Sequence, residues 1–299
     1  MLSKLRAAAL FALVAMNTLV QTTVLFVVAL FKFLLPIASA RRVLSRVLTL
    51  IAESWIGVNS AMIDHFTTTR ISVRGGDNLR YTGWYLVISN HQSWVDIVVL
   101  QKVLNRRIPF LKFFLKQKLI WVPLLGLAWW ALDFPFMKRY TPEQLKQRPE
   151  LKGADIRETR QACARFRHIP VSVMNFVEGT RFTPSKHARH AAAYQNLLRP
   201  KAGGVAFVMN AMGEILQSVV DVTIVYPAGS PTLYDLVANR VPEIRVHIRE
   251  RPIPADLLSG DYENDSEFRE RFQVWINDIW AQKDAEIAAI REAWSDSLG

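Results

Sequence analysis

The hydrophobic and polar positions of this chain change their spacing along its length, and the spacing predicts which segments form strands and helices. Trp84–Ile88 is short, continuously apolar and rich in aromatic and β-branched residues, which is typical of a buried strand. Ser89 and Asn90 interrupt this run, and apolar residues return at helical spacing over Trp94–Leu104. We therefore expect a strand, a turn and a helix in this part of the chain.

The same alternation continues toward the C-terminus. Further strands are expected over Ile71–Arg74, Asp133–Tyr140, Val171–Val177, Val219–Tyr226 and Ile244–Ile248. Helices are expected over Ala154–His168, Gly203–Met212 and, as a long amphipathic element, Phe268–Trp294, while the polar segment Thr141–Lys152 indicates a loop. Because strands alternate with helices, the sequence predicts an α/β fold with a mixed sheet flanked by helices.

The N-terminal segment is far more apolar than the rest. Ala7–Leu35 exceeds the ~20 residues needed to cross the hydrocarbon core of a bilayer. Val43–Phe66 has apolar residues at helical spacing and is a candidate for the second helix of a hairpin. Bases flank the apolar segment on both sides, so they do not decide between a spanning helix and a hairpin in one leaflet. We expect membrane-anchoring helices over residues 1–68 and a domain over 69–299 that ends in the amphipathic helix.

A second apolar segment, Ile108–Trp130, leaves two interpretations open. A transmembrane helix over Leu119–Phe136 is one of them. Pro123, Gly126 and Asp133 favour the other, a partly buried surface that faces the membrane, because a proline, a glycine and a charge disfavour a continuous apolar helix.

The formal charge of +11 points to an anionic partner, which is a nucleic acid, a membrane surface or a phosphorylated substrate. Nucleic acid is disfavoured, because no zinc-finger spacing or basic leader is present and the bases are scattered among aromatic and aliphatic residues. The single cysteine, Cys163, excludes an intrachain disulfide and a cysteine-rich metal site.

Two polar residues near the first core strand have the spacing of an acid–base pair. His91 falls in the turn after that strand, and Asp96 falls in the first turn of the following helix. An aspartate there can accept a hydrogen bond from one imidazole nitrogen and leave the other nitrogen as a base. Taken alone, the pattern is explained equally well by a helix cap and an unrelated surface histidine.

A second polar cluster, Glu178, Gly179, Thr180 and Arg181, follows the apolar run Val173–Val177. Glycine permits a tight turn, and arginine can hold a phosphate through two parallel hydrogen bonds. The glutamate can orient that arginine or bind an acceptor hydroxyl. A surface Glu–Arg pair on a turn explains the tetrapeptide equally well when it is taken alone.

Together these stretches resemble the bacterial lysophospholipid acyltransferases, the 1-acyl-glycerol-3-phosphate acyltransferase family. The family's first motif, Asn-His-x4-Asp, matches Asn90, His91 and Asp96, and its third motif matches Phe176–Arg181. Val177 stands where the family usually has proline, which alters a backbone constraint and leaves the reacting groups in place.

The remaining family motifs match more loosely. The arginine of the second motif falls on Arg139, and two lysine patterns fall on Lys116 and Lys201. The fourth motif falls on Val222–Pro227, where Tyr226 replaces a small aliphatic residue. The resemblance covers most of the chain after residue 80 and is closest to the YihG-like branch. That closeness implies the inner membrane of a Gram-negative bacterium, with the catalytic domain facing the cytoplasm.

The resemblance implies acyl transfer to the sn-2 hydroxyl of 1-acyl-glycerol-3-phosphate, with acyl-CoA or acyl carrier protein as donor and no cofactor or metal. His91 would remove the hydroxyl proton while Asp96 holds the imidazole. The residues expected to bind the substrate are Asn90, Lys116, Arg139, Glu178, Gly179, Thr180, Arg181 and Lys201.

Several alternatives stay open at this point. Backbone amides of the turn at residues 91–93 are candidates to hold the oxyanion, and Ser93 leaves an acyl-enzyme possible. Glycerol-3-phosphate or another lysolipid is an alternative acceptor. A lipase, a thioesterase or a membrane scaffold without catalysis is a less favoured interpretation.

Overall fold

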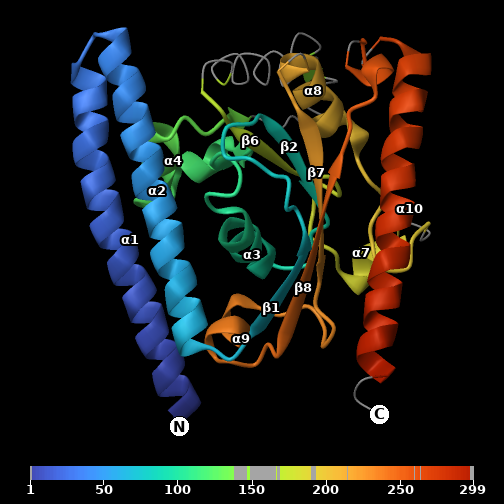
Figure 1. Ribbon diagram of the computed structural model, residues 1–299, viewed down its shortest axis with the longest axis horizontal. Helices are drawn as coiled ribbons and strands as arrows, with labels where there is room; N and C mark the ends of the chain where they lie inside the picture. Colours follow the sequence, from blue (N-terminus) through green and yellow to red (C-terminus); the bar gives the residue numbers. More distant parts are fainter. Residues whose placement is uncertain are drawn as a thin grey trace.

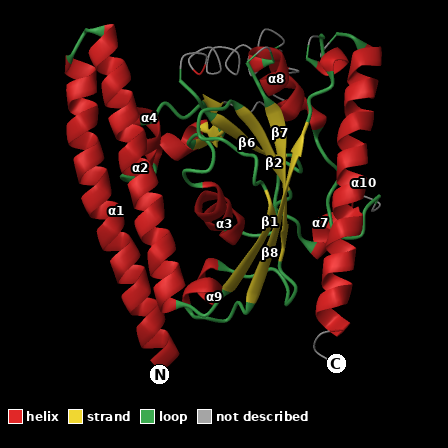
Figure 2. Cartoon of the chain, in the orientation of Figure 1, coloured by secondary structure: helices red, strands yellow, loops and turns green. Residues whose placement is uncertain are grey.

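The computed structural model describes residues 2–137, 147–148, 166, 169–189, 193–213, 215–258, 260–262 and 264–296. The helices are α1 (Leu2–Leu34), α2 (Ala38–Phe66), α3 (Val95–Leu104), α4 (Leu125–Ala131), α7 (Pro184–Arg189), α8 (Ala202–Met212), α9 (Leu233–Val237) and α10 (Ser266–Asp296), with 3-10 turns η1 (Gln117–Trp121) and η3 (Ala255–Leu257). The strands are β1 (Arg70–Gly75), β2 (Tyr85–Ser89), β3 (Leu111–Phe113), β4 (Leu115–Lys116), β5 (Phe136–Met137), β6 (Ser172–Phe176), β7 (Ser218–Val225) and β8 (Glu243–Arg251). Figure 2 shows how these helices and strands are arranged.

The centre of the molecule is a six-stranded mixed sheet in the order β1-β8-β7-β2-β6-β3, as the alternation of segments predicts. Strands β3, β6, β2 and β7 are parallel, whereas β8 is antiparallel to β7 and parallel to β1. Strands β2 and β7 are buried along their whole length, which explains their continuous apolar runs. Because β2, β6 and β7 are parallel neighbours, the segments that follow them emerge at the same edge of the sheet.

Helices cover both faces of this sheet (Figure 1). Helix α3 packs on one face, where Val95, Val99 and Leu100 join the sheet residues in one apolar cluster. Helices α8 and α10 pack on the other face, and α10 contributes an apolar stripe that includes Phe272 and Trp280. The amphipathic C-terminal helix is therefore confirmed, and its apolar stripe is the side that meets the sheet.

The N-terminal helices α1 and α2 lie side by side as a hairpin, separated from the sheet by α3 (Figure 1). Helix α2 packs against α3, and α1 contacts α4 and α9. Within the described residues, α1 is the one helix long and apolar enough to cross a membrane, over Lys4–Leu34. Helices α1 and α2 therefore form a hairpin on the side of the sheet that α3 covers.

The structure excludes a single transmembrane helix over Leu119–Phe136. That segment contains η1, a turn at Leu124 with φ of +62°, and α4, which is only seven residues long. A side chain at Gly126 would place its Cβ 2.0 Å from the carbonyl oxygen of Ile120, so the close approach of η1 to the first turn of α4 requires glycine there. The prediction of a partly buried surface agrees with this geometry, since Trp121 is highly exposed while Ala128 is buried.

Other predicted boundaries also change. The strand expected to begin at Asp133 begins at Phe136, because Asp133–Pro135 form a turn and irregular backbone, and it is described as β5 over Phe136–Met137. Residues 138–146 lie outside the described part. The loop expected over Thr141–Lys152 and the helix expected over Ala154–His168 lie almost wholly outside it. Helices α7 and α9 are additional short elements that the apolar spacing did not predict.

Candidate active site

The polar residues of the two predicted motifs meet at the carboxyl edge of the parallel strands. His91 lies two residues after β2, and Glu178 lies two residues after β6. The backbone N–H of Phe182 donates to the carbonyl oxygen of His91 at 2.7 Å, which joins the two turns directly. The sheet register therefore brings together two clusters that are separated by almost ninety residues of sequence.

Asp96 is fully buried and accepts four hydrogen bonds. Its Oδ2 lies 2.8 Å from His91 Nδ1, and it accepts from the backbone N–H groups of Gln92 at 2.6 Å and Ser93 at 2.8 Å. Its Oδ1 accepts from the hydroxyl of Tyr226 at 2.5 Å. Donors on both oxygens stabilise a charged carboxylate in a site that water does not reach.

The imidazole of His91 is held on two sides. Its ring stacks on Phe176 at the end of β6, with ring centroids 3.9 Å apart and planes 13° apart. Because Nδ1 faces the Asp96 carboxylate, the network assigns the proton to Nδ1 and a lone pair to Nε2. Nε2 has no hydrogen-bond partner among the described residues, and the side chain keeps 13 % of its surface exposed. One ring nitrogen is thus available to act as a base.

Asn90 was predicted to bind the substrate, but the structure places it in the scaffold. Its side-chain amide donates to the carbonyl oxygen of Ile224 at 2.8 Å and accepts from the N–H of Ile224 at 2.9 Å. These bonds extend the pairing between β2 and β7 beyond the last strand residue, and the side chain is fully buried. The asparagine of the motif therefore joins two strand ends instead of facing a ligand.

Neither Ser93 nor the backbone of its turn is free for chemistry. The hydroxyl of Ser93 donates to the carbonyl oxygen of Pro231 and accepts from the N–H of Val95 at the start of α3. The turn amides of residues 91, 92 and 93 all donate to the carboxylates of Glu178 and Asp96. This geometry gives no support to an acyl-enzyme on Ser93, and it corrects the expectation that these amides hold an oxyanion.

Glu178 also lies in the interior and not at the surface where a substrate would meet it. Its Oε1 accepts from the N–H of His91 at 3.0 Å, and its Oε2 accepts from the N–H of Leu198 at 3.1 Å. Burial raises the pKa of Glu178 to about 8, while the two backbone donors act in the opposite direction. The carboxyl group therefore ties the His91 turn to the segment before α8, in place of the predicted contact with substrate.

The remaining residues of the second cluster do line an accessible surface. Gly179 adopts a φ of +69°, and the side chain of Lys201 lies over it, with Cδ 3.3 Å from the position a Cβ would occupy. Arg181 is exposed, and its guanidinium lies over the ring of Trp94, with Cζ 4.7 Å from the ring centroid. The Nζ of Lys186 donates to the hydroxyl of Thr180 at 2.6 Å and to the carbonyl oxygen of Arg181 at 3.0 Å.

Lys186 was not predicted from the sequence, because it lies in a short polar helix with no motif of its own. Its ammonium adds a third cation beside Arg181 and Lys201. None of these three forms an ion pair with a carboxylate of the described residues, so the surface has positive charge available for an anion.

The other two basic residues predicted to bind substrate, Lys116 and Arg139, are not among those that the structure places at this surface. Lys116 is exposed on β4, which pairs with β5 in a separate two-stranded sheet. Arg139 lies outside the described residues. Among the described residues, no group of three or more His, Cys, Asp or Glu side chains is arranged to hold a metal ion.

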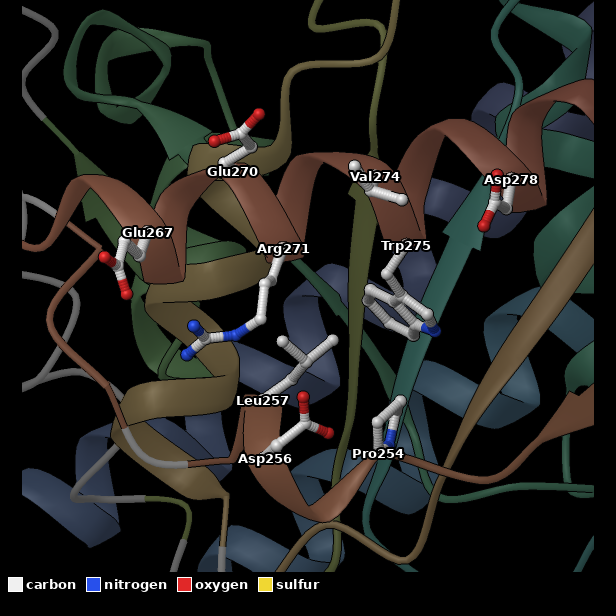
Figure 3. A pocket seen from close by; sticks show the side chains of 9 residues that line it. All are labelled: Pro254, Asp256, Leu257, Glu267, Glu270, Arg271, Val274, Trp275 and Asp278. Carbon is white, nitrogen blue, oxygen red and sulfur yellow. The ribbon is translucent and has the colours of Figure 1, made fainter.

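A separate surface hollow of about 500 Å³ lies along α10 (Figure 3). Four acidic residues, one arginine and several apolar side chains line it: Pro254, Asp256, Leu257, Glu267, Glu270, Arg271, Val274, Trp275 and Asp278. None of these residues belongs to the two motifs. The hollow is therefore distinct from the edge of the sheet where His91 and Asp96 lie.

The sequence is similar to those of known acyltransferases. A family model described as Acyltransferase matches residues 70–227. A probable 1-acyl-sn-glycerol-3-phosphate acyltransferase 5 of Arabidopsis thaliana is 26 % identical over 208 residues, covering 66 % of this chain and 52 % of that protein. The 1-acyl-sn-glycerol-3-phosphate acyltransferase gamma of Mus musculus is 24 % identical over 250 residues, covering 78 % and 56 %. The chain thus spans about half the length of the curated relatives it matches.

A solved structure shares the fold. It is the 1-acyl-sn-glycerophosphate acyltransferase PlsC of Thermotoga maritima, with a TM-score of 0.52 and 16 % identity, covering 93 % of this chain and 98 % of that chain. At this identity the similarity shows the arrangement of helices and sheet.

Proposed function

Because this chain belongs to the Acyltransferase family, we propose that it transfers a fatty acyl group to the sn-2 hydroxyl of 1-acyl-glycerol-3-phosphate, giving phosphatidate. The names of the similar proteins support this acceptor. The observation that carries the proposal is the pairing of His91 with a buried Asp96, which leaves Nε2 without a partner among the described residues, beside a surface rich in cations. The acyl donor is a thioester, either acyl-CoA or acyl carrier protein. Membership of the YihG-like branch stays a prediction.

The proposed reaction needs no enzyme nucleophile. Nε2 of His91 takes the proton of the acceptor hydroxyl while that oxygen attacks the thioester carbonyl carbon. The new C–O bond forms, the C–S bond breaks, and the leaving thiolate recovers the proton from Nε2. Asp96 stabilises the transient imidazolium through its 2.8 Å contact with Nδ1. The engaged hydroxyl of Ser93 supports direct transfer over an acyl-enzyme.

The acceptor phosphate fits the surface formed by Arg181, Thr180, Lys186 and Lys201. A guanidinium can bind two phosphate oxygens at once, and the lysines add charge. Trp94 supports the arginine through the contact of its ring with the guanidinium, and it is itself half exposed at the start of α3. A phosphate held there lies on the same edge of the sheet as the base. Lys116 and Arg139 remain candidate phosphate contacts on the basis of the family resemblance.

We also propose that the protein is attached to the bacterial inner membrane, with its catalytic domain facing the cytoplasm. Helix α1 exposes large apolar side chains such as Phe11, Leu30 and Phe33 along its length. A second exposed apolar surface, which we call the η1–α4 patch, consists of Trp121, Leu124, Leu127 and Trp130.

The η1–α4 patch is close to α1, because α4 packs against α1 and Lys32 pairs with Asp133 at 2.7 Å. Tryptophan side chains are favoured at the level of the lipid headgroups, so the patch extends the membrane contact of the hairpin. Replacement of Trp121 and Trp130 by glutamate is expected to release more protein from membranes in alkaline carbonate than replacement of Val274, an exposed apolar residue of α10. Equal release by both variants would contradict a role for the patch.

The proposed activity is tested with membranes that contain the protein, supplied with lysophosphatidate and a labelled acyl thioester. We expect labelled phosphatidate from the wild type and almost none from His91→Ala. Glycerol-3-phosphate, other lysolipids and water are offered as acceptors in parallel. Transfer to one of these in preference to lysophosphatidate would overturn the proposed acceptor, and release of free fatty acid alone would indicate a thioesterase.

A further inference from the structure

We propose that Tyr226 is a positioning residue that holds the Asp96 carboxylate in the orientation His91 needs. This inference rests on the proposed acyl transfer for its meaning, but its geometry does not depend on the substrate. The hydroxyl of Tyr226 donates to Oδ1 of Asp96 at 2.5 Å, across 130 residues of sequence.

The four contacts of Asp96 are divided unequally between its oxygens. His91 Nδ1 and the backbone N–H groups of Gln92 and Ser93 all contact Oδ2. Among the described residues, Oδ1 accepts a hydrogen bond from Tyr226 only. Without that bond one oxygen of a fully buried carboxylate would have no donor from the described residues, and a carboxylate held at one oxygen can rotate about its Cβ–Cγ bond.

Tyr226 itself is rigidly placed. It directly follows β7, whose end is joined to the His91 turn by the paired bonds between Asn90 and Ile224. Pro227 follows it, and the residue before a proline has a restricted backbone. The ring is almost completely buried in the cluster that also contains Val95 and Leu236. The hydroxyl is thus presented to Asp96 by both the backbone and the packing of the core.

The charged and titratable groups around the pair come from four elements. Asp96 lies on α3, Glu178 follows β6, and Tyr226 follows β7, while Lys283 of α10 acts on Glu178 from behind the sheet. Burial and the charge of Asp96 raise the pKa of Tyr226 well above its usual range, so the phenol remains a donor. The neutral hydroxyl of Tyr226 stabilises part of the negative charge of Asp96 at Oδ1, while Oδ2 keeps its contact with the imidazole of His91.

Tyr226→Phe removes the hydroxyl and keeps the ring. We expect kcat to fall about tenfold, because a carboxylate that is free to turn holds Nδ1 of His91 less firmly, with KM for both substrates changed less than about twofold. The acidic limb of the kcat/KM profile should move to higher pH, because a carboxylate with one fewer donor stabilises the imidazolium of His91 more strongly.

Tyr85→Phe is the matched control. Tyr85 is equally buried, and its hydroxyl accepts from the N–H of Arg80, away from Asp96. This variant should lose comparable stability with no change in the pH profile. A Tyr226→Phe enzyme with the wild-type kcat and pH profile, or one whose loss is matched by Tyr85→Phe, would overturn the proposal.

A second measurement separates this proposal from the proposed function. The imidazole signal of His91, assigned by its absence in His91→Ala, is followed by NMR as a function of pH without substrate. We expect it to titrate at higher pH in Tyr226→Phe than in wild type and to be unchanged in Tyr85→Phe. An unshifted titration overturns the positioning role whatever the reaction is, whereas failure of acyl transfer with the expected NMR shift overturns the function alone.

Discussion

Two histidine–carboxylate pairs of nearly equal geometry lie on different parts of the sheet. His91 Nδ1 is 2.8 Å from Asp96, and His247 Nδ1 is 2.9 Å from Glu286. The two imidazoles are similarly accessible, with 13 % and 19 % of the side-chain surface exposed. Distance and burial alone therefore do not distinguish a catalytic base from a structural ion pair.

The partners of the two carboxylates differ in kind. Asp96 is held by neutral donors, namely two backbone N–H groups and the hydroxyl of Tyr226. Glu286 is held by the guanidinium of Arg249 at 2.6 Å and by the hydroxyl of Thr223. A cation beside Glu286 already balances its charge, so that carboxylate stabilises an imidazolium less than Asp96 does.

The position of each pair in the fold also differs. His91 lies in the turn after a parallel strand, beside the turn after its neighbour β6. His247 lies within β8, where α10 covers the sheet and Lys283 forms a fully buried ion pair with Asp221 at 2.6 Å. Turns at the carboxyl edge of parallel strands are where side chains can meet a ligand. The neutral donors around Asp96 and the edge position of His91 support the proposal that His91, and not His247, is the base.

The strongest test of the comparison replaces each histidine by alanine. His91→Ala should reduce the rate of acyl transfer by about 10²–10⁴-fold, the usual contribution of positioned proton transfer. His247→Ala should keep the rate within about threefold, because its pair does not border the proposed substrate surface. Radiolabelled phosphatidate formation by equal amounts of the two proteins measures this difference. Similar losses in both variants would remove the distinction between the pairs.

A second test addresses the buried polar contacts between α10 and β7. The ammonium of Lys283 is fully buried and contacts Asp221, the carbonyl oxygen of Val222 at 2.7 Å and Thr223 at 3.0 Å. Lys283→Met leaves one oxygen of a buried carboxylate without its cation, so we expect the free energy of unfolding to fall by about 3–5 kcal/mol. Urea unfolding followed by tryptophan fluorescence measures the loss.

Folded Lys283→Met protein should change its pH profile for acyl transfer less than Tyr226→Phe does, because Lys283 reaches the His91 turn only through its charge on Glu178. The double variant Lys283→Met with Asp221→Asn serves as the control, since removal of both charges should restore part of the stability. A stability equal to wild type in the single variant would show that the buried pair does not hold β7 to α10.

A third test addresses the cationic surface near the first pair. Arg181→Ala should raise KM for lysophosphatidate by about 10–100-fold, the effect of losing a bidentate charged contact of about 1.5–3 kcal/mol. Arg181→Lys should recover only part of this loss, since an ammonium lacks the planar pair of donors. Arg189→Ala, which removes an exposed base of α7, is the matched control. Equal KM values for the variants at 181 and 189 would contradict a specific phosphate contact.

The smallest expected effect is the pH dependence that Glu178 gives to stability. Burial raises the pKa of Glu178 from its ordinary value near 4.5 to about 8, so the folded protein binds a proton more tightly than the unfolded chain. Its contribution to stability is complete below pH 4.5 and is lost as the pH rises through about 8. Thermal unfolding between pH 5 and pH 8 should therefore show a decline in Tm that is shallower in Glu178→Gln. An identical decline in both proteins would assign it to other groups.

The sequence alone determined the features that depend on neighbouring residues. The alternation of segments predicted the α/β fold, and β2, its turn and α3 placed His91 and Asp96 within one local unit. The contact between them forms across five residues, so the local backbone is sufficient to make it. The apolar segment α1 and the amphipathic segment α10 were likewise predictable, because periodicity reports which side of a helix is buried.

Only the tertiary structure decided the features that depend on which strand ends meet. The register of β2 against β6 and β7 turned Asn90 and Glu178 inward and brought Tyr226 to Asp96. It also left Arg181 exposed over the ring of Trp94. These contacts join residues far apart in sequence, and their geometry follows from the packing of the whole sheet. A motif therefore proposes candidate site residues, but the fold decides which of them lie at an accessible surface and which hold the others in place.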